Sequence, residues 1–340
     1  MKISHKIILA LFLLFLIWIF YWAVFAEKQD ISEKIAATLK EQEKVADLAF
    51  KDVSFEEVFE GVKYWQLNSK TATINKSTEL ATLRTVKGTF YKSGQPVLKF
   101  ISPAALWQMG EKEILLDQAI GYDVSLENKI DQLTKKKANP FASLFSLPRE
   151  YKNGQGYWFE AKNLNWKLAN QKLFCNGGIV LNKGEVSGIA DQLEADVALE
   201  KIKLSGHPKI TISPKGLSPV TLEAESFEVI SSQDLIIATG NPRVAWNDAQ
   251  INAQEIRYRQ KEKEISFSQD VKVLFRDIIA SGNLANYQTN DEKIILEGAA
   301  RAMQADNQLT GEKVMVSLRD NKISVVGQGK VVISEEELKK

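Results

Sequence analysis

Few residues in this chain have the types and spacing that catalysis requires. The sequence holds two histidines, and neither His5 nor His207 has a histidine, cysteine or carboxylate neighbour at the spacing of a metal site. A zinc site and a Ser-His-Asp arrangement are therefore not predicted. The single cysteine, Cys175, stands in an apolar alternation, which favours a packed thiol and leaves no partner for an internal disulfide.

Nucleotide and acid–base chemistry also lack their motifs. No glycine-rich stretch runs into the Gly-Lys-Ser/Thr of a phosphate loop, and Gly154-Gln155-Gly156 and Gly327-Gln328-Gly329 are interpreted as loop or bulge glycines. Asp191, Glu194 and Asp196 alternate with apolar residues, so we expect them on the solvent side of a strand rather than as catalytic carboxylates. The sequence predicts a protein that is not an enzyme and that has no cofactor and no metal site.

The composition excludes another class of function. The chain has 340 residues, of which 44% are hydrophobic and 26% charged, and its formal net charge is +1. This is the composition of an ordinary globular protein, without the excess of positive charge that a nucleic-acid binder carries. The one dense basic run, Lys135 to Lys137, is interpreted as a solvated loop.

A repeated unit organises the second half of the chain. Each unit begins at a small residue, and the starts are Ala161, Ala190, Ala224, Ala253, Gly282 and Gly311, which lie 29 residues apart except for one step of 34. Residues that are mostly apolar follow 3, 5, 12 and 14 positions after each start, and a glycine stands at position 16 of every unit except the one with Gln269. The period of two predicts strands with one apolar face. A single hairpin cannot bury this face, whereas stacked hairpins can. The sequence therefore predicts an all-β stack of antiparallel hairpins.

Less regular segments surround these units. Two looser copies precede them, at Ser69 to Leu83 and at Ser102 to Leu116. Residues 127–156 break the pattern and are predicted as a loop insertion whose apolar residues, such as Leu144-Phe145, dock on the sheet or contact a partner. Ser213 to Pro219, which lies in the 34-residue step, is predicted as a turn or as a boundary between two sub-blocks.

The N-terminus carries a candidate membrane anchor. Ile7 to Ala26 is uncharged and long enough to cross the roughly 30 Å hydrocarbon core as a helix. Aromatic residues gather at its far end and lysines precede it, which places the N-terminus in the cytoplasm and the bulk of the chain outside. A cleaved signal peptide is the alternative, but the apolar run exceeds the usual length of such a peptide. Residues 27–50 are charged and rich in helix formers, which predicts a helical stalk, with a flexible linker as the alternative.

Together these features resemble a known family. The single anchor, Phe59-Glu60-Gly61-Val62 followed by Trp65-Gln66-Leu67, and repeats such as Ala253-Gln254-Glu255-Ile256-Arg257-Tyr258 with Ile265-Ser266-Phe267 look like the lipopolysaccharide-transport bridge proteins. The resemblance implies an elongated, taco-like β-jellyroll that shields acyl chains while lipid passes from the inner membrane across the periplasm. It divides the chain into an anchor (1–26), a stalk (27–50), an LptC-like jellyroll (51–212), an OstA/LptA-like extension (220–335) and a polar tail (336–340).

The resemblance also implies partners. These are lipopolysaccharide or a related lipid, an inner-membrane ABC transporter that supplies the energy, and another β-jellyroll bridge or an outer-membrane translocon protein. The strand that ends the repeats, with Val325, Val331 and Ile333, is predicted to pair with a partner's strand by β-augmentation. The sequence departs from a simple anchored member of the family by being longer, as if it carried its own stretch of bridge.

The inward stripe of the repeats is predicted to line the lipid groove. The predicted lining residues are Trp107, Leu164, Trp166, Leu173, Leu193, Leu204, Phe227, Val229, Ile256, Tyr258, Phe267, Tyr287 and Leu296. The competing hypothesis is an anchored β-solenoid scaffold with a closed core that binds proteins through its surface or edge strands. An apolar alternating stripe is, by itself, more often core than lipid site.

Overall fold

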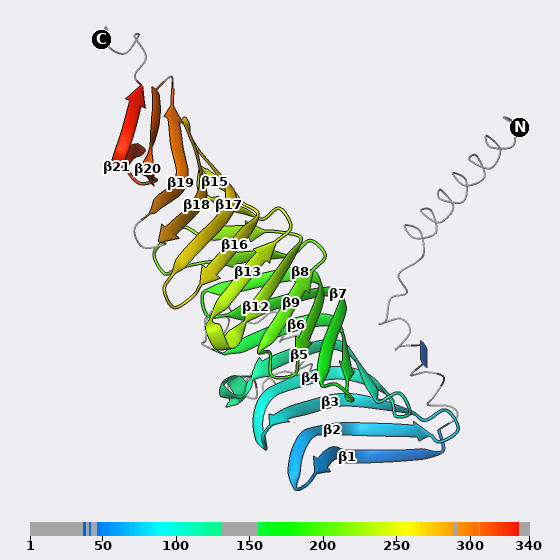
Figure 1. Ribbon diagram of the computed structural model, residues 1–340. Coiled ribbons are helices and arrows are strands. Elements are labelled where there is room, and N and C mark those ends of the chain that lie inside the picture. Colours follow the sequence, from blue (N-terminus) through cyan, green and yellow to red (C-terminus); the bar gives the residue numbers. More distant parts are fainter. Residues whose placement is uncertain are drawn as a thin grey trace, which may run out of the picture.

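The chain folds into one long antiparallel sheet. A computed structural model describes residues 37–38, 41, 46–128, 130, 156–288, 292–305 and 307–332. In this part of the chain, 21 strands from β1 (Leu48–Phe59) to β21 (Lys322–Val332) follow one another along one axis (Figure 1). Their pairings are antiparallel, which confirms the predicted all-β stack of hairpins.

The strands are long toward both ends of the stack and short in the middle. The long strands after β1 are β2 (Val62–Asn75), β3 (Leu80–Lys92), β4 (Gln95–Gln108), β5 (Glu113–Asp123), β6 (Tyr157–Lys167), β7 (Lys172–Lys183) and β8 (Val186–Asp196), and then β17 (Glu264–Phe275), β18 (Ile278–Gln288), β19 (Lys293–Gln304) and β20 (Asn307–Ser317). The short strands are β9 (Lys201–Ser205), β10 (Lys209–Ile212), β11 (Val220–Glu223), β12 (Ser226–Ile230), β13 (Leu235–Thr239), β14 (Arg243–Trp246), β15 (Ala249–Asn252) and β16 (Glu255–Arg259). Two 3₁₀ turns, η1 (Val124–Leu126) and η2 (Ser231–Gln233), complete the elements.

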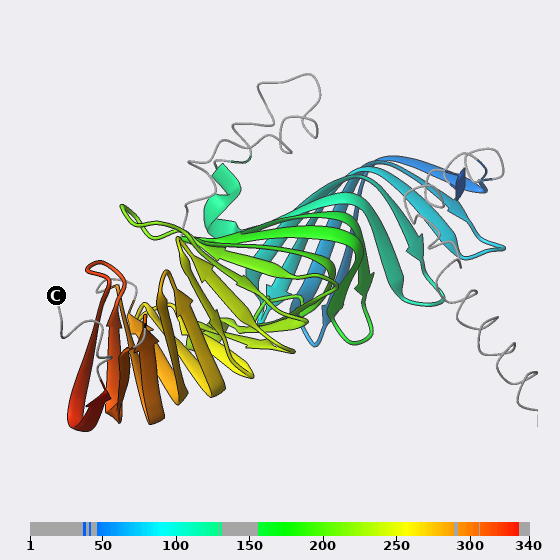
Figure 2. The same cartoon turned by 90° about the horizontal axis from the view of Figure 1, so that it is seen from above.

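The short strands are halves of strands that turn a corner. β9 and β10 are separated by Gly206 and His207, whose φ angles of 70° and 53° are left-handed, and β13 and β14 by Gly240 and Asn241, with φ angles of 79° and 51°. Glycine adopts such angles without steric cost, which is the physical reason for the glycine at position 16 of the repeat. Because the corner recurs at the same place in each unit, the sheet folds along one line into two walls (Figure 2).

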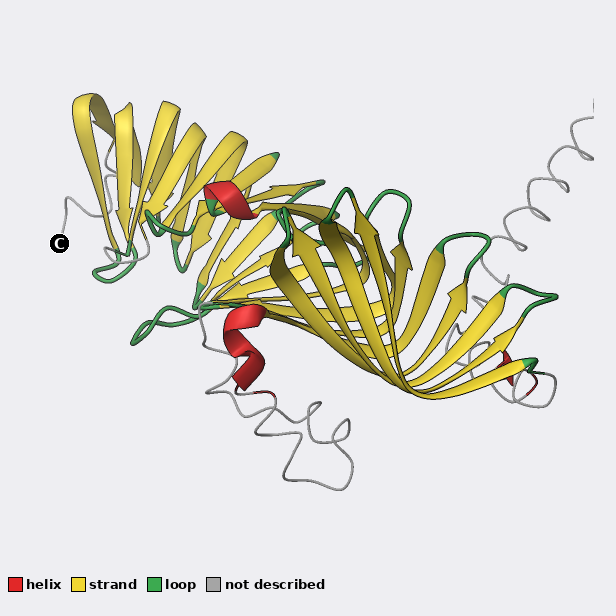
Figure 3. Cartoon of the chain, turned by 90° about the horizontal axis from the view of Figure 1, so that it is seen from below, coloured by secondary structure: helices red, strands yellow, loops and turns green. Residues whose placement is uncertain are grey.

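The two walls end in separate rows of hairpin turns. Wall A carries the turns at 168–171, 197–200, 231–234, 260–263 and 318–321, and wall B carries those at 184–185, 213–219, 247–248 and 276–277. We call the line along which these two rows face each other the mouth. Seen from below, the strands form a continuous curved surface along the whole stack (Figure 3).

Each wall presents ladders of directly paired residues to the interior. On wall A, the ladder nearer the mouth runs through Trp107, Ile114, Trp166, Leu173, Ala195, Ile202, Val229, Ile236, Tyr258, Ile265, Tyr287, Ile294 and Val316. The ladder nearer the corner runs through Leu116, Leu164, Cys175, Leu193, Leu204, Phe227, Ala238, Ile256, Phe267, Ala285, Leu296 and Val314. Wall B contributes Phe159, Leu181, Gly188, Ile210, Leu222, Val244, Ile251, Val273, Ala280 and Ala302. One hydrophobic cluster, from Trp65 to Leu318, joins these ladders.

Several sequence predictions concern the connections. Ser213 to Pro219 forms the turn between β10 and β11, which pair with each other, so the sheet continues across the predicted boundary between 212 and 220. Leu126 and Ile130, at the start of the predicted insertion, pack with Trp158 on the outer face of the sheet. Residues 131–155, with Leu144-Phe145 among them, lie outside the described residues.

The predicted anchor, Ile7 to Ala26, also lies outside the described residues. Of the predicted stalk, Ala37, Thr38 and Glu41 are helical, and β1 already begins at Leu48. Among the residues that the structure describes, no helix combines the length and the apolar character needed to cross a membrane.

The unit that lacks the corner glycine supplies a stability prediction. Gln269 holds a φ of 65°, and its carbonyl accepts a hydrogen bond from the Gln254 amide at 3.1 Å. A left-handed backbone costs a residue with a side chain roughly 1–2 kcal/mol, and glycine avoids this cost. Part of the gain is lost, because glycine also makes the unfolded chain more flexible. We expect Gln269→Gly to raise the free energy of unfolding by about 0.5 kcal/mol in urea titrations. Ser268→Gly, one residue earlier in the strand, is the control, and a stabilisation of both variants would contradict this explanation.

Candidate functional site

The residues predicted to line a groove lie together on the two ladders of wall A. All of them face the interior, and each is buried except Trp107, which is half-buried. Trp166, Tyr258 and Phe227 are among the largest fully buried side chains of the described chain. The repeat pattern in the sequence therefore identified one complete inner wall.

The predicted lining residues do not include the opposite wall. Ile210, Val244, Ile251 and Val273 are buried and form the ladder of wall B that closes the interior from the other side. The signal was present, because the alternation resumes four and six residues after the corner position, for example at Val273 and Phe275 after Gln269. The predicted inner stripe ends at the glycine of each unit and therefore leaves out the apolar residues beyond that glycine.

Aromatic rings fill the interior in the N-terminal half. The centroid of the Trp166 ring lies 4.4 Å from that of Phe90, 5.4 Å from that of Trp65 and 6.1 Å from that of Phe100. Trp107 continues the group, with its centroid 5.9 Å from Trp65. Edge-to-face contacts of this kind add to the energy of burial, so this part of the interior is a firmly packed core.

The two walls also touch in the C-terminal half. The ring centroids of Trp246, on wall B, and Tyr287, on wall A, are 5.4 Å apart. Burial raises the pKa of Tyr258 to about 12 and also raises the pKa of Tyr287. Both side chains are buried and form part of the apolar surface between the walls.

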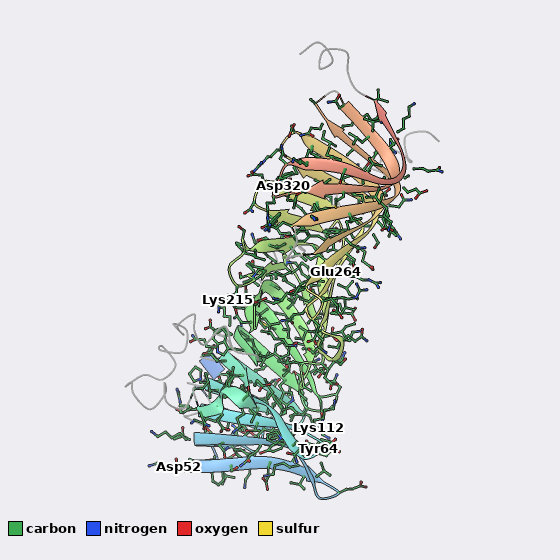
Figure 4. All side chains as sticks on the ribbon, turned by 90° about the vertical axis from the view of Figure 1, so that its left-hand side faces the viewer. Asp52, Tyr64, Lys112, Lys215, Glu264 and Asp320 are labelled. Atoms are coloured by element: carbon green, nitrogen blue, oxygen red, sulfur yellow. The ribbon has the colours of Figure 1, made fainter. Side chains whose placement is uncertain are left out.

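Free volume between the walls is small in the middle of the stack and larger at its N-terminal end. A cavity of about 30 Å³ lies between Leu181, Leu204 and Val229, which is room for roughly one or two waters. A cleft of about 810 Å³, lined in part by Trp107, Tyr64 and Lys112, lies at the end of the stack where Figure 4 labels the last two. An acyl chain can enter the middle of the interior only if the walls separate.

The cysteine is part of this packed interior. Cys175 is 0% exposed, and its thiol lies 3.3 Å from the carbonyl oxygen of Gly178, to which it donates. Burial raises the pKa of the Cys175 thiol to about 11, which leaves little thiolate near neutral pH.

We expect a disulfide reagent such as DTNB to react with Cys175 at least about 100-fold more slowly in the folded chain than in urea, at pH 8. The rate of thionitrobenzoate release measures this directly. Equal rates in the two states would contradict the packed position of the thiol.

The structure gives His207 a neighbour that sequence spacing did not suggest. His207 Nδ1 lies 3.0 Å from Asp191 Oδ2, because the corner brings the strands together. The same arrangement occurs in the next units, where Asn241 donates to Glu225 at 3.3 Å and Gln254 donates to Asp270 at 2.8 Å. These polar pairs lie on the exposed outer side of three successive corners. Among the described residues, no group of three or more possible metal ligands is found.

The predicted partner strand is the last strand of the described sheet. In the described residues, β21 pairs with β20 alone, so its outer edge is open. Val325 is half-buried against the core, and Val331 is 57% exposed. Ile333, the third residue predicted for this edge, lies outside the described residues.

The matches with known proteins cover part of the chain. One family model, described as LptA/(LptD N-terminal domain) LPS transport protein, matches residues 221–322. No curated protein matches the sequence. A crystal structure of LptH, the LptA-homologous periplasmic component of the lipopolysaccharide transport device of Pseudomonas aeruginosa, is similar with a TM-score of 0.33 and 14% identity, over 34% of this chain and 96% of that one. Over residues 221–322, this chain is similar to the lipopolysaccharide-transport family that this model describes, which its repeats also resemble.

Proposed function

We propose that this protein is an inner-membrane-anchored periplasmic carrier that passes lipopolysaccharide toward the outer membrane through the interior between its two walls. The observation that carries this proposal is the set of apolar ladders that one hydrophobic cluster joins along the stack, in a chain whose residues 221–322 match a lipopolysaccharide-transport model. The carrier performs no chemistry of its own. It resembles proteins that receive lipid from an ABC transporter, which would be the source of energy.

The energetics of lipid transfer suit such an interior. Each methylene left in water costs about 0.8 kcal/mol, so one acyl chain of a dozen carbons loses on the order of 10 kcal/mol when exposed. Ladders of leucine, isoleucine, valine and phenylalanine offer the chain a lining similar to the membrane it leaves. Transfer between the two is then close to neutral, and its direction has to come from an external energy source.

The fold provides a way for the walls to separate. In the described part of the chain, the backbone joins wall A to wall B at the corners, and the contacts across the mouth, such as Lys183 with Asp234 and Tyr157 with Ser231, are made by side chains. The wide cleft beside Trp107 lies at the end of the stack that follows the proposed anchor, which suits the entry of lipid there. The open edge of β21, with Val325, Val331 and Ile333, suits transfer to a further jellyroll or an outer-membrane translocon protein.

The test is recovery of lipid with the protein. The full chain, purified from membranes in a mild non-ionic detergent and freed of loose lipid by size exclusion, is expected to retain lipopolysaccharide detectable by mass spectrometry. A Phe267→Asp variant places a charge among the ladder residues and is expected to lose it, while Ser266→Asp, on the outer side of the same strand, is the control. Equal lipid content in all three proteins would contradict binding between the walls.

The alternative function is a membrane-anchored scaffold with a permanently closed core. The packed aromatic rings around Trp166 favour it, because they leave no open groove. The two functions differ in whether lipid ever contacts the inward residues, which the experiment closing the Discussion measures.

A further inference from the structure

One charged side chain interrupts an apolar ladder of wall B at the mouth. The ladder runs Tyr157, Lys183, Val186, Ile212, Val220, each paired directly with the next. Lys183 stands six residues after the corner glycine Gly177, a position that Ile212, Trp246 and Phe275 fill in the following units. The lysine therefore faces the interior where the repeat otherwise places a large apolar side chain.

Lys183 reaches across the mouth to wall A. Its ammonium donates to Asp234 Oδ1 at 3.3 Å, and the two side chains are only 24% and 21% exposed. Lys261, from the next turn of wall A, approaches the other oxygen of Asp234 at 3.1 Å. One carboxylate thus bridges two ammonium groups. Hydrogen bonds from Lys261, and then from Lys183, hold the pKa of Asp234 below its usual range.

This bridge covers an apolar cavity. The cavity of about 30 Å³ is lined by Lys183 and Asp234 at its top and by Leu181, Val229 and Ile236, among other residues, below. The ring of Tyr157 closes one side, 4.8 Å from the Lys183 ammonium. The arrangement is amphipathic, with two cations at the mouth and hydrocarbon beneath them.

The charges at this point do not balance. Lys183 and Lys261 carry two positive charges against the single negative charge of Asp234, and the neighbouring Lys263 is itself near Glu185, at 3.9 Å. A phosphate monoester carries a charge of about −1.5 to −2 and three acceptor oxygens, so it satisfies both lysines better than one carboxylate does. Asp234 lies in a hairpin turn, so its side chain can turn toward solvent when a phosphate takes its place between the two lysines.

We propose that Lys183 and Lys261 form a binding site for the phosphate of an anionic amphiphile, whose alkyl chain enters between the walls as the phosphate displaces Asp234. This site rests on the proposed lipid-carrier function and specifies which chemical group of the lipid is held at the mouth. It also assigns Asp234 the role of closing the mouth when no lipid is bound.

The test compares two amphiphiles that differ only in the phosphate. A photo-crosslinking residue replaces Val229 in the full chain, held in a neutral detergent, and the concentration for half-maximal adduct is measured for palmitoyl lysophosphatidic acid and for monopalmitoylglycerol. We expect the phosphate to lower this concentration about tenfold. The double variant Lys183→Gln/Lys261→Gln should abolish that preference, while Asp234→Asn should increase it about threefold, since it frees both lysines.

Glu228→Gln is the matched control. It removes an ion pair with Lys201 of 2.6 Å on the outer face of wall A and should leave the preference unchanged. A phosphate preference that survives in the double variant, or an Asp234→Asn effect equal for both amphiphiles, would overturn the site. If inorganic phosphate alone, at millimolar concentration, stabilises the wild-type chain against heat but not the double variant, and does so without lipid, the site binds free phosphate and the lipid assignment is wrong. No adduct with either amphiphile in any variant would instead reject the lipid-carrier function itself.

Discussion

Replacing Trp166 with alanine is expected to lower the free energy of unfolding by about 4 kcal/mol, the cost of removing a large aromatic side chain from a packed core. Trp166 is 1% exposed and lies against Phe90, Trp65 and Phe100, so its loss leaves a cavity that three rigid rings cannot fill. The measurement is urea unfolding of the full chain followed by far-UV circular dichroism.

Trp166→Phe is the matched variant. It keeps a ring in the cluster and removes the indole N–H, which has no hydrogen-bond partner among the described residues. Deleting an unpaired buried donor offsets part of the lost packing, so we expect a cost of about 1 kcal/mol. If Trp166→Ala lowered the free energy of unfolding no more than Trp166→Phe does, the aromatic interior would be an open groove in the resting protein, not a packed core.

The second large effect concerns a glycine on wall B. Gly121 pairs directly with Phe159, and a Cβ atom added to it would lie 2.1 Å from the Phe159 ring. The Phe159 ring lies against the glycine and is only 2% exposed, so it has little room to move away. We expect Gly121→Ala to cost about 3 kcal/mol in the same unfolding experiment, at the upper end of overpacking effects.

Gly188 provides the control within the same ladder. It also faces the interior, but a Cβ added there would meet its nearest atom, Leu204 Cδ1, at 3.5 Å, which is an ordinary contact. Its φ is not left-handed, so alanine fits the strand. We expect Gly188→Ala to change stability by less than about 1 kcal/mol, in either direction. A similar cost at both glycines would show that the ring on Gly121 does not determine the effect.

The repeat predicted wall A well because each unit is built from local signals. A small residue, two alternating apolar pairs and a glycine recur at fixed spacing. The two apolar pairs lie on two strands joined by a hairpin turn, and the glycine lies at the corner. The strict pairing of Leu164 with Cys175, or of Ile256 with Phe267, follows from that spacing alone. The sequence could therefore identify the fold and one inner wall without any knowledge of tertiary contacts.

The features that the sequence could not predict depend on how the walls meet. Wall B faces wall A only because left-handed residues at the corners, such as Gly240 and Asn241, fold the strand back. Contacts across the mouth, such as Lys183 with Asp234, join residues of different units whose separation has no periodic signature. Whether the interior is filled or open also depends on side-chain packing, and the rings around Trp166 show that it is filled in this state.

The central claim is that lipid passes between the two walls, and the most direct measurement is photo-crosslinking in living cells. A photo-reactive residue replaces Val229, Tyr258 or Tyr287 on the inner ladder of wall A, with Arg257 and Glu194, on the outer side of the sheet, as controls. We predict lipopolysaccharide adducts at the three inward positions, none at the controls, and their loss when cellular ATP is depleted. Adducts with protein alone, or no adducts at any inward position, would contradict the account and identify the chain as a closed scaffold.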